Sequence, residues 1–435
     1  MTIEIELKFI ATPQAATQLA TFIAAWPHQH EPAIALTNSY FETDDNQLRR
    51  WDMGLRIRGT GQQYEMTLKG KGNSVGGLHQ RAEYNVDIAS PQLDIARLPA
   101  EIWPEGTDVA ALQQRLQPLF STTFQRERWL AQYGKSEIEV ALDQGEVVAG
   151  DKREALHEVE LELKEGNRDD LLAFAAEFAR LAGLRLGSLS KAARGYGLAQ
   201  GNPLRPVKAV PLLQVAAKAT VEEGMAATFL LGLNQWQYHE EVWLRGNADA
   251  RHALLESLDI VRQAFSLFGA LVPRKASSEL RQNLTVLEEA LLDDNVEAHQ
   301  ICFSPLWLQT QLALTSWLVN ASWRAFVDQK AQSKLEGSYK RFADIMLGRI
   351  AADLKETFSN VRLESEYHDK AVRLARQLLA VKLLAGAYAT DAVTGWLDSW
   401  QQLLLAINEN QHNTLSWLSN QALKQPTFWL NGAPR

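Results

Sequence analysis

The sequence has 435 residues, a formal net charge of −8 and a single cysteine, Cys302. This length predicts two or three domains. The lone cysteine excludes an intrachain disulfide and a cysteine-based metal cluster, and the acidic balance excludes a general nucleic-acid-binding surface. We find no signal peptide and no apolar run long enough to cross a bilayer, and therefore expect a cytoplasmic protein with neither membrane nor nucleic acid as partner.

Neither half of the chain is basic. Residues 1–200 hold 21 Lys and Arg against 28 Asp and Glu, and the remainder holds 23 against 24. Any site for a polyanion must therefore be a local concentration of cations, because the overall field is weakly negative.

The first 200 residues consist of short alternating segments between turn residues, which is typical of antiparallel strands. Helix N-termini are indicated by Pro13 and by the pair Asp169 and Asp170. We predict strands at 2–10, 36–42, 54–60, 62–69, 79–88, 123–133, 136–143 and 155–164, and helices at 13–25, 106–117, 168–182 and 189–196. Strands in series with few helices predict an α+β fold.

The pattern of apolar and polar residues changes near residue 200. The segment GNPLRPVKAVP contains three prolines and predicts a linker at 201–212. Beyond it, residues 213–435 show long helical periodicity, and this region is long enough for two stacked helical bundles.

The opening strand, TIEIELKFI, places Glu4, Glu6 and Lys8 on one face and apolar residues on the other. One such strand would usually turn its charged face to water. The same alternation recurs, however, at Arg56 and Arg58, Thr67 and Lys69, Arg81 and Glu83, Arg126 and Arg128, Glu137, Glu139 and Asp143, and Glu158, Glu160 and Glu162. This repetition favours a closed eight-stranded barrel with a charged interior and an apolar exterior covered by helices.

The charged interior has a chemical consequence. Buried charges are tolerated when they are paired or bind ions. Arginine and lysine suit phosphate oxygens, and clustered carboxylates suit Mg²⁺ or Mn²⁺. The pattern therefore predicts a metal-dependent site for a compact polyphosphate.

Two other sequence features, a glycine-rich segment and His157, are interpreted as structural rather than functional. The glycine-rich segment GKGNSVGG, residues 70–77, lacks the order of a P-loop, so we predict a hairpin there. His157 has the opposite parity to Glu158, so we expect its side chain to face away from the interior.

The motifs together resemble the CYTH family, which includes class IV adenylyl cyclases, thiamine triphosphatase and the triphosphate tunnel metalloenzymes. The resemblance covers residues 1–200 and rests on Glu4-x-Glu6-x-Lys8 and on the segments SYFETDDNQLRRWDMGLRIR, EMTLKG, RAE, RER, LDQGEVVAG, HEVELEL and SKAARG. It implies a closed antiparallel eight-stranded β-tunnel, in agreement with the barrel inferred from the strand faces.

The resemblance also implies residue roles. The phosphate-binding residues would be Lys8, Arg56, Arg58, Lys69, Arg81, Arg126, Arg128 and Lys191. The metal ligands would be Glu4, Glu6, Glu158 and Glu160, with Glu83, Glu139, Asp143 and Glu162 as further candidates. Glu4, Glu6, Lys8 and Lys191 would take part directly in catalysis. Two metal ions, Mg²⁺ or Mn²⁺, are implied, one orienting a triphosphate and one positioning a water.

The helical half resembles the CHAD domain more weakly. In the segment ADARHALLESLDIVRQAFSLFG, His252 falls at the position of that domain's histidine, and only Arg262 remains of its usual run of arginines. The resemblance implies tandem helical bundles and long-chain polyphosphate as a second partner. Whether His252 has a functional role or is a partly buried helix residue stays open at this point.

The expected activity is metal-dependent hydrolysis of inorganic tripolyphosphate to pyrophosphate and phosphate. Two alternatives remain open from the sequence. One is another reaction of the same tunnel, namely thiamine or nucleoside triphosphate hydrolysis or class IV adenylyl cyclase activity. The other is a polyphosphate-binding scaffold without catalysis.

Overall fold

The computed structural model describes residues 2–429, and the chain divides into two compact units. The first unit comprises the chain up to Pro206 together with Glu241–Asn247 and Leu292–Asn320. The second comprises Val207–Glu240, Ala248–Leu291 and the chain from Ala321 onward. The first unit thus recruits two segments that lie far along the sequence, whereas the domain boundaries at 200 and 213 remain a prediction.

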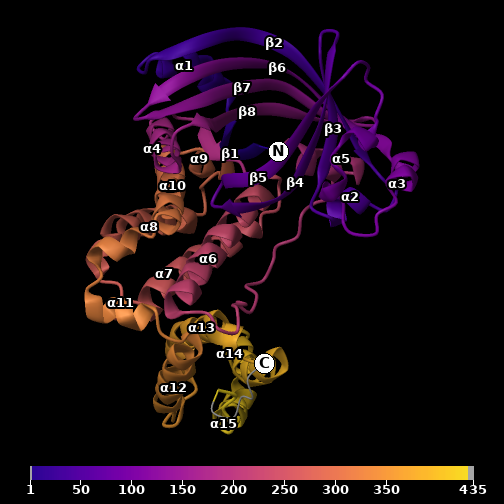
Figure 1. Ribbon diagram of the computed structural model, residues 1–435. Helices are drawn as coiled ribbons and strands as arrows, with labels where there is room; N and C mark the ends of the chain where they lie inside the picture. Colours follow the sequence, from indigo (N-terminus) through magenta and orange to yellow (C-terminus); the bar gives the residue numbers. More distant parts are fainter. Residues whose placement is uncertain (1, 430–435) are drawn as a thin grey trace. The chain divides into compact units, whose positions relative to one another are not determined.

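The first unit is built on one antiparallel sheet. Its strands are β1 (Thr2–Ala11), β2 (His28–Glu42), β3 (Gly54–Thr60), β4 (Gln63–Val75), β5 (Leu78–Ile88), β6 (Gln117–Tyr133), β7 (Ser136–Ala149), β8 (Lys152–Glu165) and β9 (Leu184–Leu186). Their order is β5-β4-β3-β2-β6-β7-β8-β1-β9, and an additional β5–β1 pairing closes the ring (Figure 1). The predicted closed eight-stranded antiparallel barrel is confirmed, with β9 attached to the remaining edge of β1.

All eight predicted strands are present, but some begin earlier than predicted. Strand β2 begins at His28 rather than at residue 36, and its pairing with β6 shifts register between Glu31 and Ile34. This irregularity coincides with Pro32, and a proline and a bulge together disturb the period-two pattern on which the prediction relied. The hairpin prediction at 70–77 is also confirmed, because Gly76 and Gly77 connect β4 to β5 with positive φ angles of 54° and 90°.

The predicted helices of this half are α1 (Pro13–Ile23), α3 (Val109–Arg115), α4 (Arg168–Phe178) and α5 (Lys191–Ala199). The four-residue helix α2 (Gln47–Arg50) was not predicted. Side-chain caps fix the helix starts, because Thr12 accepts a hydrogen bond from the amide of Ala15, and Ser190 accepts one from Ala193.

The apolar exterior of the barrel is covered as expected. Leu7 and Phe9 of β1 are fully buried beneath α1 and α4, and Phe9 stacks on Phe178 with ring centroids 5.6 Å apart. Leu308 and Leu312 belong to the same core. They lie on α10 (Pro305–Val319), which follows the short α9 (Ala298–Cys302) in the first unit. Because each strand buries its apolar face outward, its charged face must turn inward.

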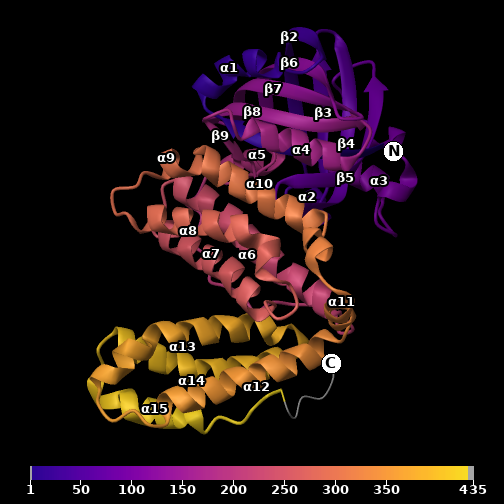
Figure 2. The ribbon, with the colours of Figure 1, turned by 90° about the vertical axis from the view of Figure 1, so that its left-hand side faces the viewer.

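The second unit is entirely helical, as predicted (Figure 2). Its helices are α6 (Val221–Leu244, of which the last turn belongs to the first unit), α7 (Ala250–Leu267), α8 (Ser278–Leu292), α11 (Gln329–Leu335), α12 (Tyr339–Phe358), α13 (Ser365–Leu384), α14 (Thr390–Asn408) and α15 (Leu415–Leu423). Phe229 of α6 packs on Phe265 of α7, and the Tyr339 hydroxyl donates to the Leu383 carbonyl at 2.9 Å. No helix within residues 2–429 is long and apolar enough to span a membrane.

Two residues of α7 bear on the CHAD resemblance. The side chain of His252 is 80% exposed and lies 3.6 Å from Glu256, so the interpretation of His252 as a partly buried helix residue is wrong. Arg262 donates to both oxygens of Glu288 at 2.6 and 2.8 Å. The remaining arginine of this motif is therefore already neutralised by a carboxylate.

Candidate active site

The barrel interior contains a cavity of about 490 Å³. The side chains that line it come from the strands around the barrel and from α5. From the predicted site they include Glu4, Glu6, Lys8, Arg56, Arg58, Lys69, Arg81, Glu83, Arg126, Arg128, Glu139, Glu160, Glu162 and Lys191. The structure therefore brings almost the whole predicted set to one interior surface.

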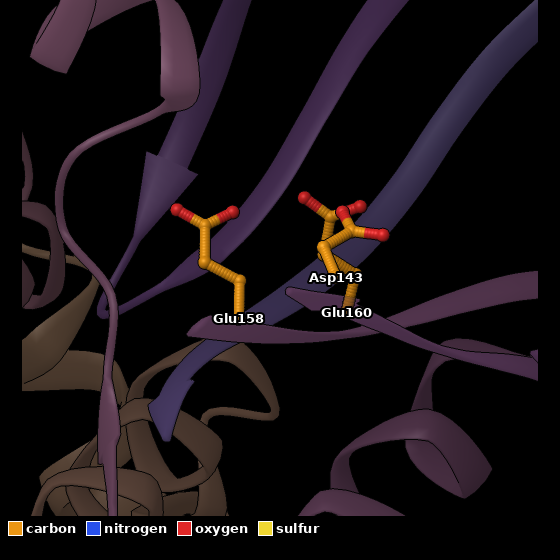
Figure 3. Close-up of side chains that lie close together, drawn as sticks. All are labelled: Asp143, Glu158 and Glu160. Carbon is orange, nitrogen blue, oxygen red and sulfur yellow. The ribbon is translucent and has the colours of Figure 1, made fainter. Parts of the chain in front are cut away.

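Two predicted residues lie behind this surface. Asp143 and Glu158 are fully buried, and together with Glu160 they form a carboxylate triad (Figure 3), in which one oxygen from each residue lies within 4.8 Å of the others. The triad forms because β7 pairs with β8 so that Asp143 stands opposite Glu158. Of the three, only Glu160 lines the cavity.

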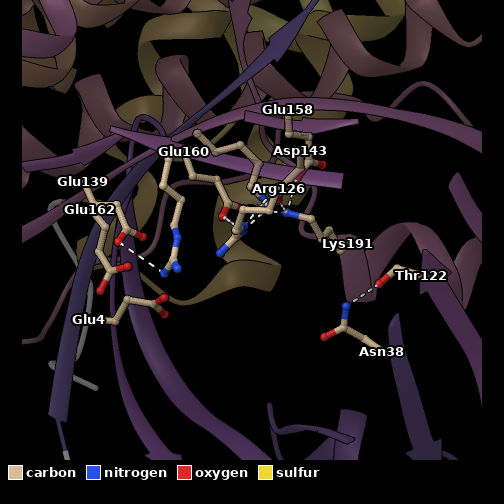
Figure 4. A network of polar contacts seen from close by, with 12 residues as sticks. Glu4, Asn38, Thr122, Arg126, Glu139, Asp143, Glu158, Glu160, Glu162 and Lys191 are labelled. Atoms are coloured by element: carbon tan, nitrogen blue, oxygen red, sulfur yellow. Dashed lines mark hydrogen bonds and ion pairs between the residues drawn. The ribbon is translucent and has the colours of Figure 1, made fainter. Parts of the chain in front are cut away.

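Cations hold the triad from several sides (Figure 4). The Nζ atom of Lys191 lies 2.7 Å from an oxygen of each of Asp143, Glu158 and Glu160. Lys8 lies 3.2 and 3.3 Å from Glu158 and Glu160. Arg126 donates to both oxygens of Asp143 at 2.7 Å, and to Glu160 at 2.7 Å. The triad is thus compensated by the chain's own cations.

The electrostatics of the triad follow from this pairing. Burial opposes charge, but Lys191 and Lys8 outweigh it and lower the pKa of Glu158 to about 2. The pKa of Lys191 is raised in turn: burial lowers it, but Asp143 and the two glutamates have the greater effect. Glu158 and Lys191 are therefore both charged at neutral pH.

A second acidic group, formed by Glu4, Glu6, Glu139 and Glu162, lines the cavity beside the triad. Glu6 and Glu139 both stand opposite Glu162 on the neighbouring strands. Burial and then the charge of Glu160 raise the pKa of Glu6, and burial raises the pKa of Glu162, with Glu4 and Glu139 adding to the effect. Glu6 and Glu162 are therefore harder to ionise here than in water.

A few cations do contact this second acidic group. Lys69 lies 2.6 Å from Glu4, Lys164 lies 2.9 Å from Glu162, and Arg128 lies 3.8 Å from Glu139.

The remaining wall is basic. The side chain of Arg58 donates to Asn38 at 3.0 Å, and the pKa of Arg58 is lowered to about 9 by burial and then by repulsion from Arg56 and Arg126. The nearest carboxylate of Arg56 is Glu83 at 3.8 Å, and its buried Nε has no hydrogen-bond partner within the described residues. Buried donors without acceptors are rare and costly, so this wall is suited to an anion.

Sequence reasoning missed several residues of the site. Arg194 is 8% exposed and donates to Glu154 at 2.6 Å and to Glu158 at 3.0 Å. Its position three residues after Lys191, on the same side of a helix, was a usable signal. Arg49 also lines the cavity, but it comes from the unpredicted helix α2. His79 lines the cavity as well, and burial lowers its pKa to about 4, so it is neutral at physiological pH.

A closed eight-stranded antiparallel tunnel with charged walls is the expected architecture of a CYTH domain, and the CYTH domain model matches residues 2–196. The CHAD domain model matches residues 227–417. The chain therefore contains a region that matches the CYTH domain, followed by a region that matches the CHAD domain.

Among curated proteins, the chain is similar to an inorganic triphosphatase from Haemophilus influenzae, with 38% identity over 198 residues. The match covers 44% of this chain and 54% of the relative, so the chain spans about half the length of that protein.

Solved structures with similar chains include a protein from Hippeastrum that is described as a putative adenylyl cyclase with a dominant triphosphatase activity. It has 20% identity and a TM-score of 0.35, covering 47% of this chain and 98% of that one. The CHAD domain from Ricinus communis has 17% identity and a TM-score of 0.36, and the match covers 51% of this chain and 91% of that one.

Proposed function

We propose that this protein is an inorganic triphosphatase that hydrolyses tripolyphosphate to pyrophosphate and phosphate inside the tunnel, with Mg²⁺ or Mn²⁺. The observation that carries the proposal is the division of one cavity of about 490 Å³ into a basic wall and an acidic wall. A compact polyphosphate bound to cations needs both walls at once. The name of the Haemophilus influenzae relative supports the same activity.

The basic wall would bind the phosphate oxygens. Arg56 has Glu83 only at 3.8 Å, and Arg56 and Arg58 repel each other, so an anion between them would satisfy Arg56 Nε and relieve the repulsion. Bidentate guanidinium contacts suit phosphate geometry. Lys69, Arg81, Arg126 and Arg128 line the same cavity and would extend the contact along the chain of phosphates.

The acidic wall fits a divalent cation. Four carboxylates lie at the cavity surface, those of Glu4, Glu6, Glu160 and Glu162. Burial, and then the charge of nearby carboxylates, raises the pKa values of Glu6 and Glu162. Hard divalent cations take such oxygen ligands. Glu158, also predicted as a ligand, is held by Lys8 and Lys191, and it would reach a cation only after those contacts rearranged.

A bound divalent cation would supply positive charge at the phosphate oxygens and make water a better nucleophile. The chain's own cations would stabilise the charge that develops on the phosphate groups. Lys191 is fixed by the triad at the cavity surface, where it would stabilise charge on the departing phosphate. Phosphoryl transfer depends mainly on positioning and charge neutralisation, so this proposal requires no Ser, Cys or His nucleophile.

A phosphate-release panel tests the proposal. We expect tripolyphosphate to be hydrolysed with a higher kcat/KM than ATP, thiamine triphosphate or long-chain polyphosphate, and to require Mg²⁺ or Mn²⁺. Faster hydrolysis of ATP or thiamine triphosphate would assign the tunnel to that substrate. Tight binding of polyphosphate without any release would instead support the scaffold alternative.

A second measurement tests the metal site without using activity. Binding to the folded state alone raises thermal stability by mass action. We therefore expect Mn²⁺ to raise the melting temperature of the wild type and to have little effect on a Glu4→Gln/Glu6→Gln variant. An equal shift in both proteins would place the cation elsewhere.

A further inference from the structure

The carboxylate triad is connected to residues that lie outside the matched CYTH segment. Arg194 joins Glu158 to Glu154, as described above. Glu154 Oε1 and Oε2 accept hydrogen bonds from Arg245 at 2.9 and 3.1 Å. Arg245 also donates to Glu241 at 2.7 Å, and Glu241 lies 2.9 Å from Arg185. A continuous chain of ion pairs therefore runs from Glu158 to the last turn of α6.

This chain of ion pairs lies within one compact unit. Glu241 and Arg245 belong to the segment Glu241–Asn247, which clusters with the tunnel. The side chains of Glu241, Arg194 and Glu158 are 7%, 8% and 0% exposed, and those of Glu154 and Arg245 are 21% and 22% exposed. Ion pairs in such surroundings are screened little by solvent, so their geometry is well defined.

Arg194 depends on Glu154 for its orientation. Its guanidinium is held by three acceptors, namely Glu154, Glu158 and the carbonyl of Ala155. Glu154 is held in turn by Arg245, whose fork of donors engages both of its oxygens. Without Arg245, Glu154 would be free to rotate toward water, and Arg194 would lose the contact that directs it at Glu158.

We propose that Arg245, anchored by Glu241, is a positioning residue for the tunnel reaction. It holds Glu154 so that Arg194 keeps the Glu158 carboxylate in place, and Glu158 in turn fixes Lys8 and Lys191 at the cavity surface. A segment of the chain beyond the CYTH match thereby completes the tunnel's active site. This inference rests on the proposed function for its substrate.

The test introduces Arg245→Met into the wild type and into the Arg194→Met variant. Activity is measured at a temperature where circular dichroism shows every variant to be folded. Partners that orient a site carboxylate commonly matter by about 10- to 100-fold in activity. We expect Arg194→Met to lower kcat for tripolyphosphate to that extent. Arg245→Met alone should lower kcat by about 3- to 10-fold, with less than about a twofold change in KM, because it acts on the reacting geometry rather than on substrate binding.

The double variant decides between positioning and general destabilisation. If Arg245 acts through Arg194, Arg245→Met should cause no further loss of kcat in the Arg194→Met background. An equal loss in both backgrounds would overturn the inference, as would an unchanged kcat of Arg245→Met. Arg245→Lys should recover part of the rate, since it restores one charge to Glu154.

Controls separate this inference from the proposed function. Arg324→Met removes another arginine–glutamate pair, Arg324 with Glu222, which is remote from the triad in sequence, and should leave kcat unchanged. If Arg245→Met does not fold, Glu241→Gln tests the same chain, and an unchanged kcat of that variant would overturn the inference. A wild type that leaves tripolyphosphate intact would refute the proposed function, whereas an active wild type with an unaffected Arg245→Met would refute the positioning role alone.

Discussion

At the scale of single residues, the acidic wall of the cavity holds crowded carboxylates and the basic wall holds crowded cations. Glu6 is crowded by other carboxylates, and Arg58 is crowded by other cations, so each is held at an electrostatic cost. Such unfavourable placement is typical of functional sites, because the ligand supplies the missing charge. Removing either side chain should therefore impair function without weakening the fold.

The first prediction concerns Glu6. The folded protein raises the pKa of Glu6 through burial and the charge of Glu160, so the ionised form is destabilising at neutral pH and Gln should be tolerated. We expect Glu6→Gln to lower tripolyphosphate hydrolysis by about 100-fold or more while its melting temperature stays equal or rises. Glu146→Gln, which changes an exposed glutamate paired with Arg153, is the control and should keep wild-type rates. A Glu6→Gln variant with near wild-type turnover at saturating metal would refute the metal role.

The second prediction concerns Arg58. Replacing it with Met removes a partly buried cation that Arg56 and Arg126 repel, so the free protein should melt at an equal or higher temperature. Charge-assisted hydrogen bonds are worth about 1.5–3 kcal/mol, and the affinity for tripolyphosphate should therefore fall by about 10-fold or more. Calorimetric titration measures the affinity in a metal-containing buffer. Unchanged affinity would place Arg58 outside the substrate contact.

At the scale of elements, the site depends on where β8 meets the start of α5 and the end of α6. Strand β8 supplies Glu154, Glu158 and Glu160, and α5 presents Lys191 at its first turn and Arg194 one turn later. The last turn of α6 then supplies Glu241, and Arg245, which directly follows this helix, joins the same network. The network thus joins three elements that no local sequence signal relates to one another.

A pH experiment probes this network. Burial opposes the charge of Glu241, but Arg185 and Arg245 lower its pKa to about 2 from an ordinary value of 4.5. A carboxyl with a lowered folded pKa stabilises the protein above the unfolded value and loses that contribution as the pH falls toward the folded value. We expect Glu241→Gln to be less stable than wild type by about 3 kcal/mol at pH 6, and this difference to shrink between pH 4.5 and 2. A difference in the free energy of unfolding that is independent of pH in this window would contradict the ion-pair role.

At the scale of the whole molecule, the unit that contains the tunnel extends beyond the CYTH match. Its core includes Leu308 and Leu312 of α10, and its ion-pair network includes Arg245. The tunnel is thus completed by chain segments that sequence comparison assigns to the CHAD domain, whose match spans residues 227–417.

A truncation tests this dependence. A fragment ending at Pro206 retains every residue predicted to take part in chemistry, but it exposes the apolar surface that Leu308 and Leu312 cover. We expect it to aggregate in size-exclusion chromatography and, where soluble, to hydrolyse tripolyphosphate more slowly than the full chain. A monomeric fragment with the full kcat would show that the later segments are dispensable. The full-length double variant Leu308→Asp/Leu312→Asp should reproduce the aggregation.

The CHAD domain itself should bind long-chain polyphosphate weakly. Arg262 is neutralised by Glu288, and polyphosphate affinity depends on how many free cations are engaged. In the full chain with Arg56→Ala and Arg58→Ala, which impair the tunnel, we expect only weak binding that vanishes at moderate salt. Tight binding by this variant would reveal a basic surface formed by residues dispersed along the helical sequence.

Much of this protein is determined by the sequence alone. Period-two alternation predicts eight strands with charged inner faces, because neighbouring side chains on a strand must point to opposite sides. The closed tunnel and the helical second half follow from that pattern and from the helical periodicity beyond residue 213. The same reasoning places Glu4, Lys8 and Arg56 at one interior surface, where the structure finds them.

Other features are decided by the tertiary structure. Strand register decides whether a charged residue on an inner face is exposed to the cavity or paired behind its surface. It places Asp143 opposite Glu158 and leaves Glu160 at the cavity surface. The link from Glu154 to Arg245 depends on a contact between residues 91 positions apart. Periodicity reports which way a side chain points, but only the packing of distant segments determines which charge it meets, and this pairing decides whether a buried carboxylate is satisfied or is left for a cation to bind.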